Sequence, residues 1–376
     1  MDVAFITTRL VDRDAQGNFS EATLAGLKER CSRVVLYTFA FERRPQDGIE
    51  IRYIGGENRH STISNVKALL RTGRLARELA SFDLLVLAGP DIGILPAIHR
   101  AKRFNRNIRI FWVYHSLTPP EFLPSLKDRL LARIRKLVYI ASMKRSDGIQ
   151  TFSRFVKGEL VDAGIDADKI FPMPFAIDTK RFSTGNGSAS VRDHYGLQHS
   201  FVMLYVGRLA PAKRIDLLIN VLQMFEGGVA LLIVGGGPEK EKLEKLAKDS
   251  GGNVIFAGRV PDEELQSYYA ACDVWITASE HEGFCVPIVE AMAAGRPVIV
   301  PDVAAMPETA GDAGLTYPAG NLAAMAAAIR RLKDDRESYN RLSATARNTA
   351  GNFEIREKMG KYLDMLLASG VNCLLK

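Results

Sequence analysis

The sequence lacks the features that identify several protein classes at once. Its four cysteines are far apart and form no CxxC pair: Cys31, Cys272, Cys285 and Cys373. They indicate neither a disulfide framework nor a zinc cluster, and they predict free thiols in a reducing compartment. No apolar run approaches the ~18–20 residues of a membrane-spanning helix, and the N-terminus lacks the basic region and apolar core of a signal peptide. We therefore expect a cytoplasmic protein.

Nucleotide and metal motifs are also missing. No GxxxxGK[ST] loop occurs, which argues against a P-loop NTPase. Gly235-Gly236-Gly237 follows a strand-like run, as the dinucleotide-binding fingerprint does. A dehydrogenase would also require the third glycine of that fingerprint and an acidic residue for the ribose, and both are absent. The carboxylate pairs at 12–14 and 166–168 look like loop charges, because two carboxylates seldom define a magnesium site. We expect no metal and no bound cofactor.

The charged residues are unevenly distributed. Residues 1–180 hold 29 Lys and Arg against 20 Asp and Glu, whereas residues 181–376 hold 21 against 23. The net charge of +7 therefore comes from the first half. Such asymmetry predicts that the first half meets an anionic partner, either a nucleic acid, an acidic substrate or a membrane surface.

Short apolar runs alternate with longer amphipathic ones along the whole chain. Strand-like runs lie at 3–8, 34–39, 84–88 and 108–114, and again at 201–206, 229–234, 254–256, 274–277 and 298–300. Helical runs lie at 64–80, 127–144, 212–225, 238–249, 262–271 and 286–294. This alternation predicts α/β domains with parallel sheets covered on both faces. Two series of it predict two domains, joined within 174–200, where small turn-forming residues gather.

Two segments place reactive side chains just after predicted strands. Segment 206–214 puts Arg208 and Lys213 at the carboxyl edge of the second sheet, where open α/β sheets bind ligands. A guanidinium and an ammonium five residues apart suit a diphosphate, although alone they fit a solvated loop equally well. Segment 281–290 carries Glu282 and Glu290 before and within a predicted helix whose free N–H groups can face an anion or a sugar.

The spacing of the two glutamates bears on the kind of chemistry. If most of the segment between Glu282 and Glu290 is helical, they lie roughly 10–12 Å apart. That is too far for the carboxylate pair of a retaining glycosidase, which needs about 5–5.5 Å. The spacing suits two contacts at opposite ends of one elongated ligand.

Together these segments resemble the large retaining glycosyltransferase family 4. The resemblance rests on Gly207-Arg208-Leu209 with Lys213, and on Glu282 and Glu290 in EGFCVPIVEAMAAGRPVIV. Further matching pieces lie at 256–260, 264–265, 271–274 and 307–308, so the resemblance covers about 201–317 in the family's order. It implies a GT-B fold, in which two Rossmann-like doubly wound parallel-sheet domains face each other across a cleft.

The resemblance also implies a division of labour. Residues 1–180 would form the acceptor-binding domain, to which a C-terminal crossover helix at about 353–376 returns, and residues 198–352 would bind a nucleotide-diphosphate sugar. Arg208 and Lys213 would hold the donor diphosphate, and Glu290 the ribose. Glu282 would contact the donor sugar, with main-chain groups at Phe284, Cys285 and Val286 completing that pocket. Backbone at Arg259 and Val260 would face the base.

The first half matches the family less closely. Of the glycines that the family often places in the first loop beside the donor phosphates, only Gly17 can serve here. His115 ends a predicted strand and resembles the histidine that lines the family's sugar pocket; the alternative is a strand-end histidine bonded to a nearby loop. Asp262 could accept a hydrogen bond from guanine or serve as a helix N-cap.

These features predict a retaining, metal-independent hexosyltransferase for glycan, glycolipid or polysaccharide assembly, with Glu282 and His115 at the reacting sugar. The basic amphipathic run 127–140 suits either an anionic membrane surface, with a lipid-linked acceptor, or a core-packed helix with a solvated face. A sugar-nucleotide epimerase of the same architecture is an alternative. A nucleic-acid binder would explain the basic half but not the Glu282 and Glu290 segment, and no such motif occurs. The donor base, the sugar and the acceptor are not specified.

Overall fold

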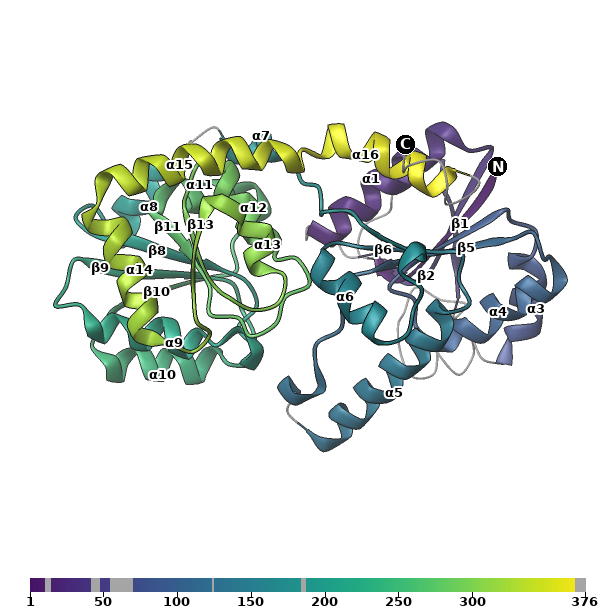
Figure 1. The fold of residues 1–376 in the computed structure, drawn as a ribbon, viewed down its shortest axis with the longest axis horizontal. Helices are drawn as coiled ribbons and strands as arrows, with labels where there is room; N and C mark the ends of the chain where they lie inside the picture. Colours follow the sequence, from purple (N-terminus) through teal and green to yellow (C-terminus); the bar gives the residue numbers. More distant parts are fainter. Residues whose placement is uncertain (11–14, 42–47, 55–69, 124, 184–186, 369–376) are drawn as a thin grey trace. The chain divides into compact units, whose positions relative to one another are not determined.

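The computed structural model describes residues 1–10, 15–41, 48–54, 70–123, 125–183 and 187–368 (Figure 1). The chain divides into two compact units. The first comprises Met1–Pro120, Pro124–Ala176 and Arg356–Lys376, and the second comprises Glu121–Leu123 and Ile177–Ile355. Each is an α/β layer structure around one parallel sheet, which confirms the predicted fold class.

The first unit is built on a seven-stranded sheet in the order β3-β2-β1-β4-β5-β6-β7. Its strands are β1 (Asp2–Leu10), β2 (Arg33–Phe41), β3 (Glu50–Tyr53), β4 (Leu84–Ala88), β5 (Arg109–Tyr114), β6 (Gly148–Thr151) and β7 (Ile170–Pro172). All neighbouring strands pair in parallel. Strands β3, β6 and β7 escaped sequence prediction because they are short or interrupted by polar residues.

Helices cover both faces of this sheet. They are α1 (Ala15–Arg30), α3 (Thr72–Leu79), α4 (Leu95–Phe104), α5 (Leu126–Met143), α6 (Arg154–Asp162) and α16 (Ile355–Leu367). Helices α3, α4, α5 and α6 pack their apolar residues on one face of the sheet, with Trp112 and Leu85 at its centre. Helices α1 and α16 lie side by side on the other face (Figure 1).

The second unit repeats the plan with six strands in the order β10-β9-β8-β11-β12-β13. Its strands are β8 (Phe201–Val206), β9 (Val229–Val234), β10 (Asn253–Gly258), β11 (Val274–Ile276), β12 (Val298–Pro301) and β13 (Gly314–Tyr317). Its helices are α7 (Thr179–Ser183), α8 (Ser188–Tyr195), α9 (Ile215–Asn220), α10 (Lys240–Ser250), α11 (Asp262–Ala271), α12 (Val286–Ala293), α13 (Met306–Ala310), α14 (Leu322–Asp334) and α15 (Arg336–Ala350). All five predicted strands of this half are present, and β13 is an addition.

Strand order reverses at one point in each sheet. The chain winds outward from β1 in one direction and from β4 in the other, and likewise from β8 and β11. The loops that leave β8 and β11 at their carboxyl ends therefore diverge over opposite faces of the sheet and leave a crevice between them. Ligand sites of doubly wound folds lie in this position, so these two loops are the expected location of a ligand site.

The chain passes between the units at residues 176–177 and 355–356. The two passing segments are held together, because Ile177 N donates to Phe353 O and Ile355 N donates to Ile177 O, both at 2.9 Å. Helices α7 and α8 already belong to the second unit, and the junction at 176–177 lies within the segment 174–200 in which we expected the link. Among the described helices, none is long and apolar enough to span a membrane.

Candidate active site

The two motif segments follow the strands that flank the reversal point of the second sheet. The loop after β8 begins at Gly207 and runs through Arg208 to Lys213, which ends a 3-10 turn. The loop after β11 carries Glu282 and leads into α12. Because β8 and β11 are neighbours, the topology brings together residues that lie about 70 positions apart in the sequence.

Lys213 and Glu282 form an ion pair between the loops that follow β8 and β11. The distance from Lys213 Nζ to Glu282 Oε1 is 2.5 Å, and only 23% and 19% of the two side chains is exposed. A second ion pair, Arg214 to Glu280 at 2.6 Å, joins the same two loops. Lys213 and Glu282 were predicted to sit on different parts of one ligand, so their direct contact places the two predicted subsites next to each other.

Arg208 differs from Lys213 in its surroundings. Its side chain is exposed, and within the described part of the chain no acidic residue pairs with it. Arg208 therefore presents an uncompensated guanidinium at the carboxyl edge of the sheet. A guanidinium in this setting suits bidentate binding of phosphate oxygens.

The glycine-rich loop after β9 packs against the loop after β8. A Cβ added to Gly235 would lie 1.9 Å from the carbonyl oxygen of Gly207, and one added to Gly237 would lie 2.2 Å from that of Leu209. In addition, Leu209 N donates to Gly236 O at 3.0 Å. The glycines are needed for this backbone-to-backbone contact, which positions the loop that carries Arg208.

Glu290 lies on α12 and is held by a buried tyrosine. Tyr269 Oη donates to Glu290 Oε2 at 2.6 Å. Burial raises the pKa of Glu290 to about 7, while the hydrogen bond from Tyr269 and the positive charge of Arg181 act to lower it. Helix α12 begins only at Val286, so half of the Glu282-to-Glu290 segment is not helical. The helix start agrees with the predicted helix 286–294, but the condition behind the distance of roughly 10–12 Å, a mostly helical segment, is not met.

Asp262 is the first residue of α11, and its carboxylate forms an ion pair with Arg181. Arg181 binds it at 2.5 Å and also donates to its backbone carbonyl. The N-cap of the helix is Pro261, so of the two alternatives considered for Asp262, the N-cap role does not hold. The base-facing candidates lie nearby: Arg259 is exposed and packs beside Gly236, and Val260 is partly exposed.

The start of α12 has the geometry expected of a binding loop. Phe284 and Cys285 are buried, Val286 is the first helical residue, and Cys285 has φ +72°. Helix α12 is eight residues long. Its second residue is Pro287, which has no N–H, and Ile288 N donates to Cys285 O at 3.1 Å. The N–H of Val286, which has no carbonyl four residues earlier in the helix, is therefore the one that the helix start can offer to a ligand.

Left-handed backbone at non-glycine residues marks the candidate site. The described residues with this conformation are Ser116, Arg214, Cys285 and Ala304. Ser116 follows His115, Arg214 follows Lys213, and Cys285 is itself a candidate. Ala304 precedes Ala305, whose backbone N donates to Glu282 O at 3.2 Å. Such conformations cost about 1–3 kcal/mol each and gather where function requires them.

In the first unit, His115 follows β5 at the carboxyl edge of its sheet. Its ring stacks on Phe152, with ring centroids 4.6 Å apart. The surface of the side chain is partly exposed, yet burial of the ring lowers its pKa to about 4. His115 is therefore a neutral imidazole near pH 7. It can exchange a hydrogen bond with a hydroxyl but carries no charge.

Gly17 does not lie in the first loop, where the sequence placed it. Strand β1 extends to Leu10 and α1 begins at Ala15, which puts Gly17 in the first turn of the helix. The loop between these two elements, 11–14, lies outside the described residues. The expected position of Gly17 was therefore wrong by a few residues.

Sequence reasoning missed Tyr269 and Arg181. Tyr269 contacts Glu290, 21 positions away, and Arg181 contacts Asp262, 81 positions away. No local sequence pattern predicts contacts over such separations. The pair Tyr268-Tyr269 inside a predicted helix was the only available signal. As for metals, no cluster of three or more His, Cys, Asp or Glu side chains suited to an ion occurs among the described residues.

Comparison with known proteins assigns a family to both halves. A model described as Glycosyltransferase Family 4 matches residues 17–181, and one described as Glycosyl transferases group 1 matches residues 191–349. The O-antigen chain mannosyltransferase B of Escherichia coli is 31% identical over 292 residues, which are 75% of this chain and 73% of that protein. A GDP-mannose-dependent alpha-mannosyltransferase of Mycobacterium tuberculosis is 28% identical over 71% of this chain and 69% of its own.

Solved structures show the same fold at lower identity. HepE from Anabaena, crystallised with UDP, superimposes with a TM-score of 0.79 at 19% identity over 97% of this chain and 99% of its own. Sucrose-phosphate synthase from Thermosynechococcus elongatus gives 0.78 at 20% identity over 98% and 100%. With two doubly wound parallel sheets and sequence matches over both halves, the chain belongs to the GT-B glycosyltransferases of family 4.

Proposed function

We propose that this glycosyltransferase moves a mannosyl residue from GDP-mannose to an acceptor hydroxyl with retention of the anomeric configuration. The observation that carries the proposal is the ion pair of Lys213 with Glu282, in the same loop as an exposed Arg208 for which no acidic partner occurs among the described residues. It supports cations for a diphosphate close to a carboxylate for a sugar. GDP-mannose is favoured because the relatives of about 30% identity include GDP-mannose-dependent and O-antigen mannosyltransferases. The neighbour solved with UDP is only 19% identical and bears on the fold alone.

In the proposed reaction, the bond from the anomeric carbon to the β-phosphate oxygen breaks and negative charge grows on the diphosphate. Arg208, Lys213 and the N–H of Val286 at the start of α12 stabilise that charge. Preorganised donors of this kind usually supply the largest catalytic term. These cations do the work that a metal does elsewhere, so we propose that the reaction needs no metal.

The acceptor oxygen attacks the same face that the phosphate leaves, and the leaving phosphate takes the acceptor proton. Glu282 accepts hydrogen bonds from the sugar hydroxyls as the ring becomes oxocarbenium-like. His115 contributes as a neutral hydrogen-bonding group, because burial keeps its pKa near 4. Backbone groups at Phe284, Cys285 and Val286 complete the sugar pocket.

The nucleotide end of the donor is assigned to residues of the same unit. Glu290, oriented by Tyr269, accepts hydrogen bonds from the ribose hydroxyls. Main-chain groups at Arg259 and Val260 contact the base. Asp262 is paired with Arg181, so a guanine contact through its carboxylate would have to share that carboxylate with the guanidinium.

The acceptor is proposed to be a glycan or lipid-linked glycan at an anionic membrane surface, at the inner face of the membrane. The support is the excess of 29 basic over 20 acidic residues in 1–180. A basic surface attracts anionic lipid at about 1 kcal/mol per Lys or Arg close to it. Neither a nucleic acid nor a resident cofactor is needed for this role.

The proposal is tested first by thermal shift with GDP, UDP, ADP and dTDP. We expect GDP to stabilise the protein most and Glu290→Gln to abolish the difference between nucleotides and buffer. Transfer is then measured with GDP-mannose, and the anomeric configuration of the product is read from its NMR spectrum. Stabilisation by UDP alone would overturn the choice of base, an inverted product would overturn retention, and isomerised donor without acceptor would indicate an epimerase.

A further inference from the structure

Helix α5 of the first unit carries an apolar face that is open to solvent. Its large apolar side chains are 36–82% exposed: Leu126, Leu130, Leu131, Ile134, Leu137 and Val138. Only Ala132, Tyr139, Ser142 and Met143 of this helix are buried. Contiguous apolar exposure on a soluble protein marks a binding surface.

The exposed apolar residues occupy one side of the helix. At 100° per residue they span an arc centred opposite the buried Ala132, Tyr139 and Met143. Basic residues flank that arc on both sides, with Arg129 and Arg133 at one edge and Arg135 at the other. We call the six exposed apolar residues and these flanking cations the α5 face. An apolar stripe bordered by Lys and Arg is the pattern of a helix that lies in a membrane interface.

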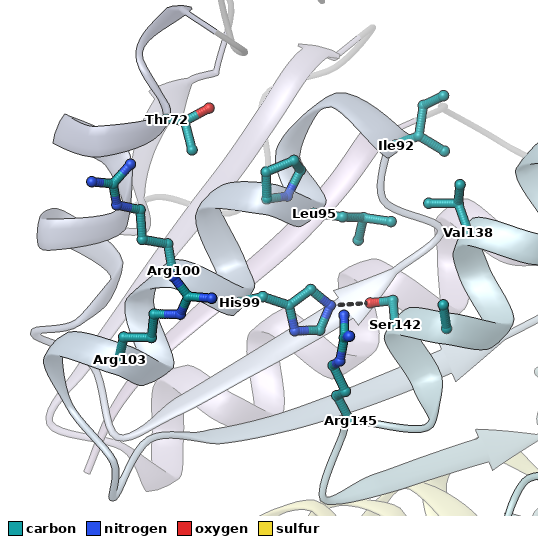
Figure 2. Close-up of a pocket in the computed structure, with 11 residues that line it drawn as sticks. Thr72, Ile92, Leu95, His99, Arg100, Arg103, Val138, Ser142 and Arg145 are labelled. Atoms are coloured by element: carbon teal, nitrogen blue, oxygen red, sulfur yellow. Dashed lines mark hydrogen bonds between the residues drawn. The ribbon is translucent and has the colours of Figure 1, made fainter.

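The α5 face continues into a pocket between α4 and α5. This pocket has a volume of about 470 Å³ and is shown in Figure 2. Its apolar lining includes Leu95 and Ile92 from the α4 side and Val138 and Ala141 from α5. Val138 belongs to both the α5 face and the pocket lining, so the two features form one continuous surface.

The rim of the pocket is cationic. Arg100, Arg103 and Arg145 line it, all three are exposed, and none of its lining residues is acidic. Within the described part of the chain, no carboxylate pairs with any of the three. Lys102 on the same helix, in contrast, is neutralised by Asp147 at 2.6 Å. The pocket therefore keeps a concentration of positive charge that its neighbourhood does not.

Helix dipoles account for only part of this charge. Arg103 and Arg145 lie at the C-terminal ends of α4 and α5, where cations are favourable in any case. Arg100 lies in the middle of α4, and no dipole effect calls for it. Its position over an apolar pocket is instead what a phosphate with attached acyl chains would need.

His99 forms part of the floor of the pocket. Its Nε2 lies 2.7 Å from Ser142 Oγ, as the dashed line in Figure 2 marks. Burial, together with the positive charges of Arg145 and Lys102, lowers the pKa of His99. The floor is therefore uncharged near neutral pH, and the positive charge of the pocket resides in the three arginines.

We propose that the α5 face and the α4/α5 pocket form a docking surface for an anionic phospholipid bilayer. The leucines of α5 enter the boundary between headgroups and acyl chains, and the guanidinium groups of Arg100, Arg103 and Arg145 hold the phosphate of one lipid headgroup. A planar guanidinium fork matches a phosphate in geometry and charge. This inference rests on the proposed membrane-borne acceptor and specifies where the membrane binds.

The test is co-sedimentation of the full chain with vesicles of phosphatidylcholine alone or mixed with phosphatidylglycerol. We expect binding to the mixed vesicles only, weakened by salt. Each basic residue at an anionic surface contributes about fivefold to partitioning, so the triple variant R100Q/R103Q/R145Q should bind about 10²-fold less. The variant L130S/L137S should lose at least about tenfold, because two apolar side chains no longer enter the interface.

Matched controls separate docking from net charge and from folding. The charge control is the variant K245Q/K248Q/R341Q, which removes the same charge from exposed positions of the second unit and should retain most binding. The control for apolar exposure is V161S, which removes one apolar side chain of α6 that is 39% exposed in the wild type. Nucleotide-induced thermal shift, which reports the donor site, should be unchanged in every variant. If the wild-type protein binds nucleotides but does not bind anionic vesicles, the docking surface is refuted while the transferase proposal stands.

Two further outcomes would also overturn the inference. Equal loss of binding in the arginine triple variant and in its charge-matched control would mean that no headgroup occupies the pocket. If light scattering shows a dimer that L130S/L137S converts to a monomer, and vesicles are not bound, the α5 face is an interface between two copies of the chain.

Discussion

Lys213 Nζ lies 2.5 Å from Glu282 Oε1, so the residue expected on the donor phosphates and the residue expected on the donor sugar are paired with each other. Neither charge is left unpaired in the crevice, which avoids the cost of burying an isolated ion. In the proposed reaction, a phosphate of the nucleotide sugar would replace Glu282 as the partner of Lys213. Glu282 would then be available to the sugar hydroxyls when the donor binds.

The first prediction concerns this pair. Glu282→Gln should lower kcat by about 10²–10³, the usual loss when one preorganised group at the reacting centre is removed. The fold should remain intact, because Lys213 and Glu282 are linked only by side chains on the crevice surface. The matched control is Glu280→Gln, which breaks the neighbouring pair with Arg214. Near-normal turnover in folded E282Q would remove Glu282 from the reaction.

The second prediction is that activity survives the removal of divalent metals. If Arg208 and Lys213 neutralise the leaving diphosphate, kcat measured with excess EDTA should equal kcat without it. Arg208→Gln should lose about 10²–10³ in kcat, and added Mg²⁺ should not restore it. Rescue of R208Q by Mg²⁺, or inhibition of wild type by EDTA, would show that a metal shares this task.

The third prediction identifies Tyr269 as a positioning residue. Its hydroxyl is bound to Glu290 at 2.6 Å, and a hydrogen bond to a charged group contributes about 1.5–3 kcal/mol. Tyr269→Phe should therefore raise the donor KM about tenfold with little change in kcat. The hydrogen bond from Tyr269 stabilises the ionised form of Glu290. Its loss should therefore raise the pKa of Glu290 and move the pH profile of KM to higher pH.

Tyr268→Phe is the control for this substitution. Tyr268 is adjacent in the helix, and its hydroxyl contacts only Tyr195 Oη at 3.4 Å among the hydrogen bonds of the structure's described residues. The KM profile of Y268F should match that of wild type. A uniform loss of activity in Y269F at every pH, without a shift of the profile, would indicate a structural role only.

The fourth prediction links Glu290 to stability. Burial raises its pKa from 4.5 to about 7, so between these pH values the folded protein binds more protons than the unfolded chain. Stability from this group is full below about pH 4.5 and is lost as pH rises through about 7. Relative to Glu290→Gln, wild type should lose about 1–3 kcal/mol of unfolding free energy from pH 5 to pH 8. Denaturation curves that stay parallel across this range would contradict the raised pKa.

Local patterns predicted most strands and helices of the second unit and the edge of the sheet at which the candidate residues lie. Strands β8 and β11 and helix α11 were readable from apolar runs, and the motifs placed Lys213 and Glu282 at the correct sheet edge. The sequence could not reveal their direct contact, since it depends on two strands being neighbours. It likewise missed the pairing of Asp262 with Arg181, because a carboxylate at a helix start looks like a cap until its partner is known.

The basic run 127–140 also shows what a sequence pattern leaves undetermined. The sequence left open whether its apolar residues pack on the sheet or face solvent. The structure buries only a few positions of α5 and leaves Leu130 and Leu137 at 58% and 68% exposure. Helical periodicity identifies a stripe but not its direction, and α5 has two stripes, one around Ala132 and Tyr139 and one around Leu130.

The fifth prediction concerns the glycine-rich loop. Gly235 has φ +137° and Gly227 has φ +133°, so alanine is strained by backbone conformation at both positions. They differ in space, because a Cβ on Gly235 would meet the carbonyl oxygen of Gly207 at 1.9 Å, whereas nothing lies within 4 Å of one on Gly227. Gly235→Ala should thus cost roughly 1–3 kcal/mol more than Gly227→Ala. It should also weaken nucleotide binding, since the loop that must yield carries Arg208. Urea denaturation and nucleotide thermal shift measure the two effects, and equal destabilisation by the two substitutions would mean that the loop contact can be relieved at no cost.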